Sequence, residues 1–133
     1  MKKLFFIIGL MMSCPVMSQY RSEVWVSDEG NGMYKNPVLY ADYSDPDVCV
    51  VGDDYFLTAS SFNCAPGLPI LHSRDLVNWK IVNYALKKVE PVEFYNEARH
   101  GKGVWAPSIR FHKGIYYIYW GDPDFGIFMV KTR

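Results

Sequence analysis

Short apolar runs recur along the chain, separated mostly by Gly, Pro, Asn or Asp. Runs rich in Val, Ile, Tyr and Phe and bounded by such turn residues are typical of β-strands. They predict strands at 48–51, 55–60, 69–73, 79–84, 108–111, 115–120 and 126–131. No stretch longer than about ten residues has a clear helical period. We therefore predict an all-β fold in which the polar segment 87–102 forms a looped insertion.

The predicted strands repeat along the sequence. The hairpin 47–58 is matched about 60 residues later by the hairpin 108–119, and a third strand follows each hairpin. A fourth strand follows only in the first copy. Units of three or four short antiparallel strands are typical of β-propeller blades, and a ring of fewer than about four blades does not close. We predict two blades, the second incomplete, and expect the rest of the ring in a missing C-terminal remainder.

The N-terminus has the pattern of an exported protein. Residues 1–18 begin with two lysines after the initiator, continue into an apolar run and end on small residues. They predict a signal peptide, too short for a membrane span, and hence a secreted or periplasmic protein. A lipid anchor at Cys14 is the alternative. A connecting segment at 19–36 would then precede a partial propeller domain at 37–133.

Charge and composition narrow the class of partner. Loss of residues 1–18 leaves a net charge of about −2, so the sequence predicts no nucleic-acid partner. Aromatic residues make up 17% of the chain and suit either sugar rings or a β-sheet core. Cys49 and Cys64 follow the predicted signal peptide. The sequence is compatible with a disulfide between them and with two free thiols. With no cluster of Cys and His, we predict no metal site.

A carboxylate stands at the mouth of the first predicted strand. Asp45 precedes Pro46, which fixes the direction of the chain and removes a backbone donor. A sugar-cleaving enzyme could keep a general base at such a place, whereas a turn-capping Asx residue is the alternative. Asp47 points to the same face if the segment is extended, and is the second candidate for the base.

Four further residues are candidates for contact with a sugar. Trp105, before the second copy of the hairpin, would form a wall of the site and Phe62 would cover it, with core or loop packing as the alternatives. His100 lies in a loop that would reach the rim, with solvated surface as the alternative. Asp122, in a tight turn, would line the cavity.

Five segments carry a family resemblance. They are YADYSDPD at 40–47, TASSF at 58–62, LHSRDLVNW at 71–79, GVWAP at 103–107 and GDPDFG at 121–126. From about residue 37 onward the chain resembles the N-terminal part of glycoside hydrolase family 43, of the arabinofuranosidase and β-xylosidase type, and the segments come in that family's order. In this pattern Asp75 is expected to bond turn amides and Trp79 to pack between blades.

The resemblance implies a five-bladed propeller that cleaves α-L-arabinofuranosidic or β-xylosidic bonds of plant polysaccharides or oligosaccharides with inversion. It places the general base at Asp45. The family's two other carboxylates, a general acid Glu and an Asp that tunes it, have no match here, so the fragment is expected to be inactive alone. No cofactor is implied, although the complete propeller has room for a calcium ion on its axis. A retaining mechanism with Asp45 as nucleophile, a non-catalytic sugar-binding propeller and an inactive truncated fragment are the alternatives.

Overall fold

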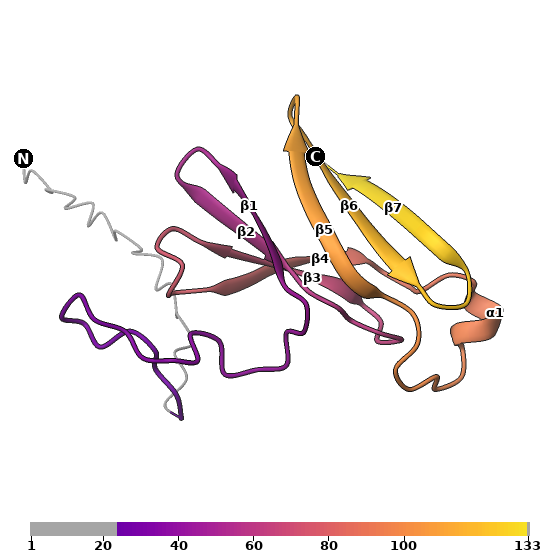
Figure 1. The fold of residues 1–133 in the computed structure, drawn as a ribbon, viewed down its shortest axis with the longest axis horizontal. Helices are drawn as coiled ribbons and strands as arrows, with labels where there is room; N and C mark the ends of the chain where they lie inside the picture. Colours follow the sequence, from indigo (N-terminus) through magenta and orange to yellow (C-terminus); the bar gives the residue numbers. More distant parts are fainter. Residues whose placement is uncertain (1–23, 133) are drawn as a thin grey trace, which may run out of the picture.

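The computed structural model describes residues 24–132, which form two antiparallel β-sheets (Figure 1). The strand order is β1-β2-β3-β4 in the first sheet and β5-β6-β7 in the second. The strands are β1 (Asp47–Val51), β2 (Asp54–Thr58), β3 (Gly67–Ser73), β4 (Lys80–Leu86), β5 (Trp105–His112), β6 (Ile115–Asp122) and β7 (Gly126–Thr132), and the helix α1 is Val92–Tyr95. The predicted all-β fold is confirmed.

The predicted signal peptide and the alternative anchor at Cys14 lie outside the described residues. Among the helices of residues 24–132, none is long and apolar enough to cross a membrane.

Every predicted strand is present, but β5 begins earlier than the sequence indicates. It starts at Trp105 rather than Ser108 and therefore includes Pro107. The pairing of β5 with β6 shifts register between Trp105 and Ser108. A strand accepts a proline where its ladder is interrupted, because no backbone N–H is needed there. The bulge explains why a strand continues through a residue that normally ends one.

The tight turns follow from local sequence. In the β5–β6 hairpin His112 pairs with Ile115, which leaves Lys113 and Gly114 as the loop. Both loop residues have positive φ, 48° and 80°. Two-residue hairpin turns of this type match the right-handed twist of their strands and require positive φ at both positions. The Lys-Gly pair therefore fixes the register of the hairpin.

The main core lies between the two sheets. Cys49 of β1, Leu68 of β3, Ile109 of β5 and Ile118 of β6 are buried together there. The two first strands, β1 and β5, lie side by side (Figure 1), and the carboxylate of Asp47 accepts hydrogen bonds across this junction. The sheets are arranged as consecutive propeller blades. The number of blades in the complete ring stays a prediction.

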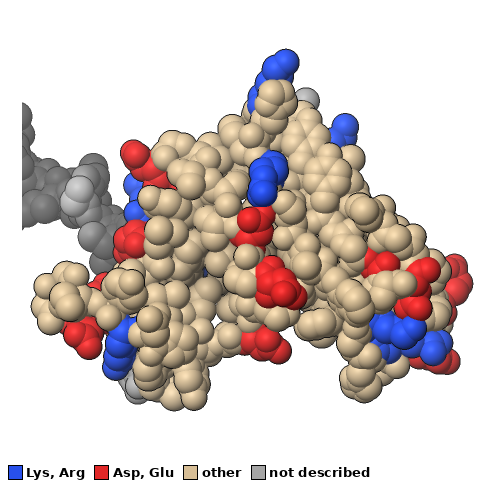
Figure 2. Space-filling view, viewed as in Figure 1, with Lys and Arg blue, Asp and Glu red and all other residues tan. Residues whose placement is uncertain are grey.

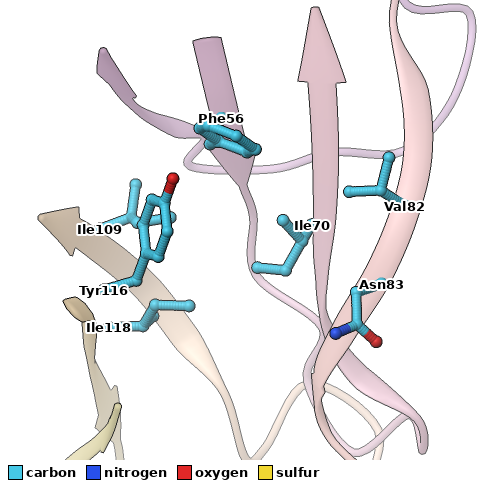
Figure 3. A pocket seen from close by; sticks show the side chains of 7 residues that line it. All are labelled: Phe56, Ile70, Val82, Asn83, Ile109, Tyr116 and Ile118. Carbon is cyan, nitrogen blue, oxygen red and sulfur yellow. The ribbon is translucent and has the colours of Figure 1, made fainter. Parts of the chain in front are cut away.

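The two sheets enclose an apolar cleft of about 160 Å³. Figure 3 shows Ile109, Tyr116 and Ile118 on one side of this cleft and the side chains of β3 and β4 on the other, with Phe56 of β2 at one end between them. Its lining consists of Phe56, Ile70, Val82, Asn83, Ile109, Tyr116 and Ile118. None of the predicted site residues is among them, so the cleft is part of the junction between the sheets.

The opposite face of the first sheet has its own smaller core. Trp79 packs there with Leu57 and Leu71, so it does not contribute to the contact between the two described sheets. Asp75 accepts hydrogen bonds from the amides of Val77 (2.9 Å) and Asn78 (2.7 Å). Its predicted role as a turn-capping residue is confirmed.

Both cysteines among residues 24–132 are free, Cys49 being buried and Cys64 exposed. Burial, followed by the nearby charge of Asp47, raises the pKa of the Cys49 thiol. The thiol therefore stays protonated and behaves as a small apolar group of the core.

Candidate active site

Three chain segments from different parts of the sequence meet at one end of the two sheets. They are the segment that leads into β1, the segment that leaves β2 and the start of β5. Asp45, Phe62 and Trp105 lie in these three segments, so the fold brings together three of the residues that the sequence predicts for the site.

Asp45 is exposed and is held in an unusual backbone conformation. Its φ is 48°, a left-handed value that is uncommon for residues other than glycine. Its Oδ2 accepts a hydrogen bond of 3.1 Å from the hydroxyl of Ser60. On the preceding residue, the Ser44 carbonyl accepts from the Ser60 amide at 3.0 Å. The carboxylate is thus oriented by the end of β2 while its other oxygen remains open.

Ser60 links the predicted base to the second sheet. Its side chain is buried, and its hydroxyl oxygen accepts a hydrogen bond of 2.8 Å from the amide of Ala106. One hydroxyl therefore joins Asp45 to the residue that follows Trp105. Ser60 is not among the residues that the sequence predicts for the site. The only sign of its role in the sequence is a hydroxyl residue at the end of a predicted strand that pairs with the strand following Asp45 and Pro46.

Phe62 and Val104 pair backbone to backbone and hold the two loops together. The Phe62 amide donates to the Val104 carbonyl at 3.1 Å, and the Val104 amide donates back at 3.0 Å. Gly103 makes this approach feasible. A Cβ at Gly103 would lie 2.4 Å from the carbonyl oxygen of Phe62, and its φ of 95° also favours glycine.

Trp105 presents part of its ring to solvent. The residue is 42% exposed, and its indole N–H donates to the carbonyl of Gly101 at 2.8 Å. The polar N–H of the ring is therefore already hydrogen-bonded within the protein. An exposed indole whose N–H is already bound offers an apolar face to a ligand.

Three of the six non-glycine residues with positive φ among residues 24–132 lie in the candidate site or directly beside it. Asp45, Phe62 and Ala106 all have positive φ, at 48°, 50° and 39°. Each such conformation costs about 1–3 kcal/mol and persists only when its surroundings hold it in place. Such residues cluster at active sites, which supports a functional reading of this end of the sheets.

Asp47 links the two sheets. Its Oδ2 accepts from the Ile109 amide at 2.8 Å and from Arg110 Nη1 at 2.6 Å. These bonds fasten β1 to β5. The carboxylate is therefore a structural link between the sheets, which makes Asp47 the weaker of the two candidates for a base.

The other two predicted sugar contacts, Asp122 and His100, lie in different surroundings from Trp105. Asp122 is buried, with a hydrogen bond of 2.6 Å from the hydroxyl of Tyr95 to Oδ2 and with the amides of Asp124 and Phe125 on Oδ1. Both of its oxygens are occupied by this chain's own donors. His100 is exposed in the turn just before Gly101. Contact of either side chain with substrate stays a prediction.

Within residues 24–132, no group of three or more His, Cys, Asp or Glu side chains is placed to hold a metal ion. Calcium in a complete propeller stays a prediction.

Comparison with known proteins identifies the family. Residues 34–132 match the family model described as glycosyl hydrolases family 43. The chain belongs to glycosyl hydrolases family 43. This family membership confirms the resemblance inferred from the five sequence segments.

Several curated relatives and solved structures are similar to this family 43 chain. A beta-xylosidase of Formosa agariphila is 37% identical over 109 residues, covering 80% of this chain and 18% of the relative. A non-reducing end alpha-L-arabinofuranosidase of Bacteroides ovatus is 38% identical over 106 residues, covering 75% of this chain and 20% of the relative. The structure of a bifunctional GH43-CE protein of Bacteroides eggerthii matches with a TM-score of 0.64 at 37% identity, over 73% of this chain and 13% of that one.

The chain spans about a fifth of the length of these two curated relatives.

Proposed function

We propose that this chain supplies the general base and one wall of the sugar-binding site of an inverting glycoside hydrolase. The bonds cleaved are α-L-arabinofuranosidic or β-xylosidic, in plant cell-wall polysaccharides or their oligosaccharides. One observation carries the proposal. The exposed carboxylate of Asp45 is joined through the Ser60 hydroxyl to the residue that follows the exposed indole of Trp105.

Asp45 suits the role of a base in an inverting reaction. Inversion needs one carboxylate to accept a proton from the attacking water while a carboxylic acid protonates the leaving oxygen from the opposite face. The two carboxyl groups stand about 6.5–9.5 Å apart, which leaves room for the water. In this proposal Asp45 is the proton acceptor, since one oxygen is oriented by Ser60 and the side chain is open to solvent. The acid comes from outside the described residues.

Trp105 and Phe62 form the proposed sugar-facing surface. The apolar C–H face of a pentose packs well on an aromatic ring. The pairing of Phe62 with Val104 places both aromatic residues beside the same junction of loops. His100, exposed in the turn before Gly101, is a further candidate at the rim.

The test compares Asp45→Asn with a matched control in the full-length gene product. Asp53→Asn is the control, because Asp53 is an exposed carboxylate in the β1–β2 turn. Hydrolysis of aryl arabinofuranoside and aryl xyloside is measured for each. Loss of the general base lowers turnover by more than about a hundredfold, whereas the control keeps the activity of the wild type. Equal turnover of Asp45→Asn and wild type would exclude Asp45 as the base.

The stereochemistry of the product separates inversion from retention. Proton NMR of the sugar released in the first seconds identifies its anomer. We expect the inverted anomer, and the retained anomer would assign Asp45 to the nucleophile's role instead.

Export of the protein is part of the proposal, because polysaccharide substrates lie outside the cell. The pattern of residues 1–18 supports it. N-terminal sequencing of the secreted protein should begin at Gln19, and a lipid-linked Cys14 at the N-terminus would favour the anchor.

A further inference from the structure

The segment between β4 and β5 provides the hydrogen-bond partner of the candidate sugar-binding indole. The N–H of Trp105 donates to the Gly101 carbonyl at 2.8 Å. Gly101 lies in a turn closed by the Lys102 amide, which donates to the Arg99 carbonyl at 2.9 Å. The orientation of the indole therefore depends on where this segment holds its Gly101 carbonyl.

Two contacts fasten this segment to the β6–β7 turn. Lys102 Nζ bonds both oxygens of Asp124, at 2.7 and 2.9 Å, and the hydroxyl of Tyr95 donates to Asp122 Oδ2 at 2.6 Å. Exposed ion pairs such as that of Lys102 contribute little in water. The bond from Tyr95 reaches a buried side chain, and the loss of a hydrogen bond to a buried polar group costs more free energy than the loss of an exposed one. Tyr95 is therefore the firmer of the two attachments.

Asp122 forms a rigid base for this attachment. Its Oδ1 accepts from the amides of Asp124 (2.9 Å) and Phe125 (3.1 Å), which shapes the β6–β7 turn. Its Oδ2 accepts the hydrogen bond from the Tyr95 hydroxyl. Burial, followed by the hydrogen bond to Asp122, raises the pKa of the Tyr95 hydroxyl. The hydroxyl thus stays protonated and donates over the whole working range of the protein.

Aromatic packing supports the same geometry. Phe94 meets Tyr95 and Phe125 edge to face, with ring centroids 5.0 and 5.2 Å apart. The guanidinium of Arg99 lies over the Phe94 ring at 4.5 Å. Figure 2 shows basic and acidic side chains gathered over α1 and the β6–β7 turn. These contacts hold the N-terminal part of the segment from α1 to Gly101 in place. Its C-terminal residue, Gly101, provides the carbonyl that accepts from the indole N–H.

We propose that Tyr95 is a positioning residue for the sugar-facing indole of Trp105, acting through Asp122 and the Gly101 carbonyl. This inference rests on the proposed function, in which Trp105 packs against a pentose. Asp122 then acts beneath the site as the anchor of Tyr95. A displaced indole weakens substrate binding, because small misplacements far from the reacting atoms reduce productive binding.

The test uses the full-length gene product labelled with 5-fluorotryptophan. Tyr95→Phe keeps the ring and removes only the hydroxyl, and Asp122→Asn keeps an acceptor but removes its charge. Tyr34→Phe is the matched control, because Tyr34 is exposed in the segment before β1. The fluorine signal of Trp105 is assigned with Trp105→Phe.

We expect Tyr95→Phe to shift the Trp105 signal and leave those of Trp25 and Trp79 in place, with a smaller shift in Asp122→Asn. We also expect the KM of Tyr95→Phe for an aryl pentoside to rise about fivefold, with a smaller change in kcat. Tyr34→Phe should match the wild type in both measurements.

Two outcomes overturn the inference. An unchanged Trp105 signal in Tyr95→Phe would show that the indole does not depend on Tyr95. Shifts of all tryptophan signals together would show a general structural role. Failure of the proposed function looks different, because Trp105→Phe would then leave KM unchanged while Tyr95→Phe still moved the Trp105 signal.

Discussion

The hydroxyl of Ser60 lies 3.1 Å from Asp45 Oδ2 and, on its other side, 2.8 Å from the amide of Ala106. A single buried side chain from the segment after β2 thereby connects the loop before β1 to the start of β5. The position of the proposed base relative to Trp105 depends on this serine.

Replacement of Ser60 by alanine should reduce both activity and stability. The Ala106 amide loses its acceptor and Asp45 loses its donor, which lowers the free energy of unfolding by about 1 kcal/mol. We expect kcat/KM for aryl pentosides to fall about tenfold, because the carboxylate is no longer held. Ser108→Ala, which changes a half-buried hydroxyl on β5, is the control. Equal kcat/KM in the two variants would contradict the orienting role of Ser60.

Asp47 should matter for the junction of the sheets rather than for chemistry. Asp47→Asn weakens the bonds to the Ile109 amide and to Arg110. Bonds to a charged group contribute about 1.5–3 kcal/mol, so the midpoint of urea unfolding should fall clearly, with residual turnover retained. Loss of turnover as complete as in Asp45→Asn, without loss of stability, would instead make Asp47 the base.

Gly103 should tolerate no side chain. In Gly103→Ala the new Cβ meets the Phe62 carbonyl oxygen at 2.4 Å and its carbon at 2.8 Å. We expect a loss of about 2 kcal/mol or more in stability, measured by thermal unfolding. Gly121→Ala is the matched control, since a Cβ there meets nothing within 4 Å. Similar melting temperatures for the two variants would contradict the close approach of the loops.

Asp75 should make stability depend on pH in the acid range. Burial is the largest single influence and opposes ionisation, but hydrogen bonds from Asn78, Val77 and Ser73 together lower the pKa from 3.8 to about 2. Because the pKa is lower in the folded state, the ionised form stabilises the fold. This contribution is complete above about pH 4 and is lost as the pH falls toward about 2.

Urea unfolding at pH 5 and pH 2.5 checks this expectation. Asp75→Asn keeps the turn geometry without a titrating group, so its stability should change less between the two pH values than that of the wild type. Asp53→Asn, in an exposed turn, serves as the control. An identical pH dependence for wild type and Asp75→Asn would show that Asp75 contributes nothing to it.

Local sequence was sufficient for most of the fold. Apolar runs bounded by turn residues predicted every strand, and the Lys113-Gly114 pair determines its hairpin directly. The start of β5 was missed because Pro107 normally ends a strand, and only pairing with β6 shows that a bulge accommodates it. The helix α1 was missed because four residues are too few to show a helical period.

The candidate site residues could be named from the sequence only where a motif marks them. Asp45 and Trp105 stand in recognisable segments, and the fold brings those segments together. Ser60 and Tyr95 act through partners 46 and 27 residues away in sequence. No local pattern reports such distant contacts. Asp122 likewise has the residue type of a ligand-binding group, and only the structure shows its two oxygens bonded to Tyr95 and to turn amides.

Hydrogen bonds join the two sheets at several places, among them Asp47 on Ile109, Ser60 on Ala106 and the backbone pairing of Phe62 with Val104. A single fastening would act as a pivot, whereas several spaced along the same junction resist both sliding and rotation. The angle between the blades is thus set independently of any bound sugar. In the proposed function, a pentose would meet a preformed site at this end of the molecule and would spend none of its binding energy on bringing the walls together.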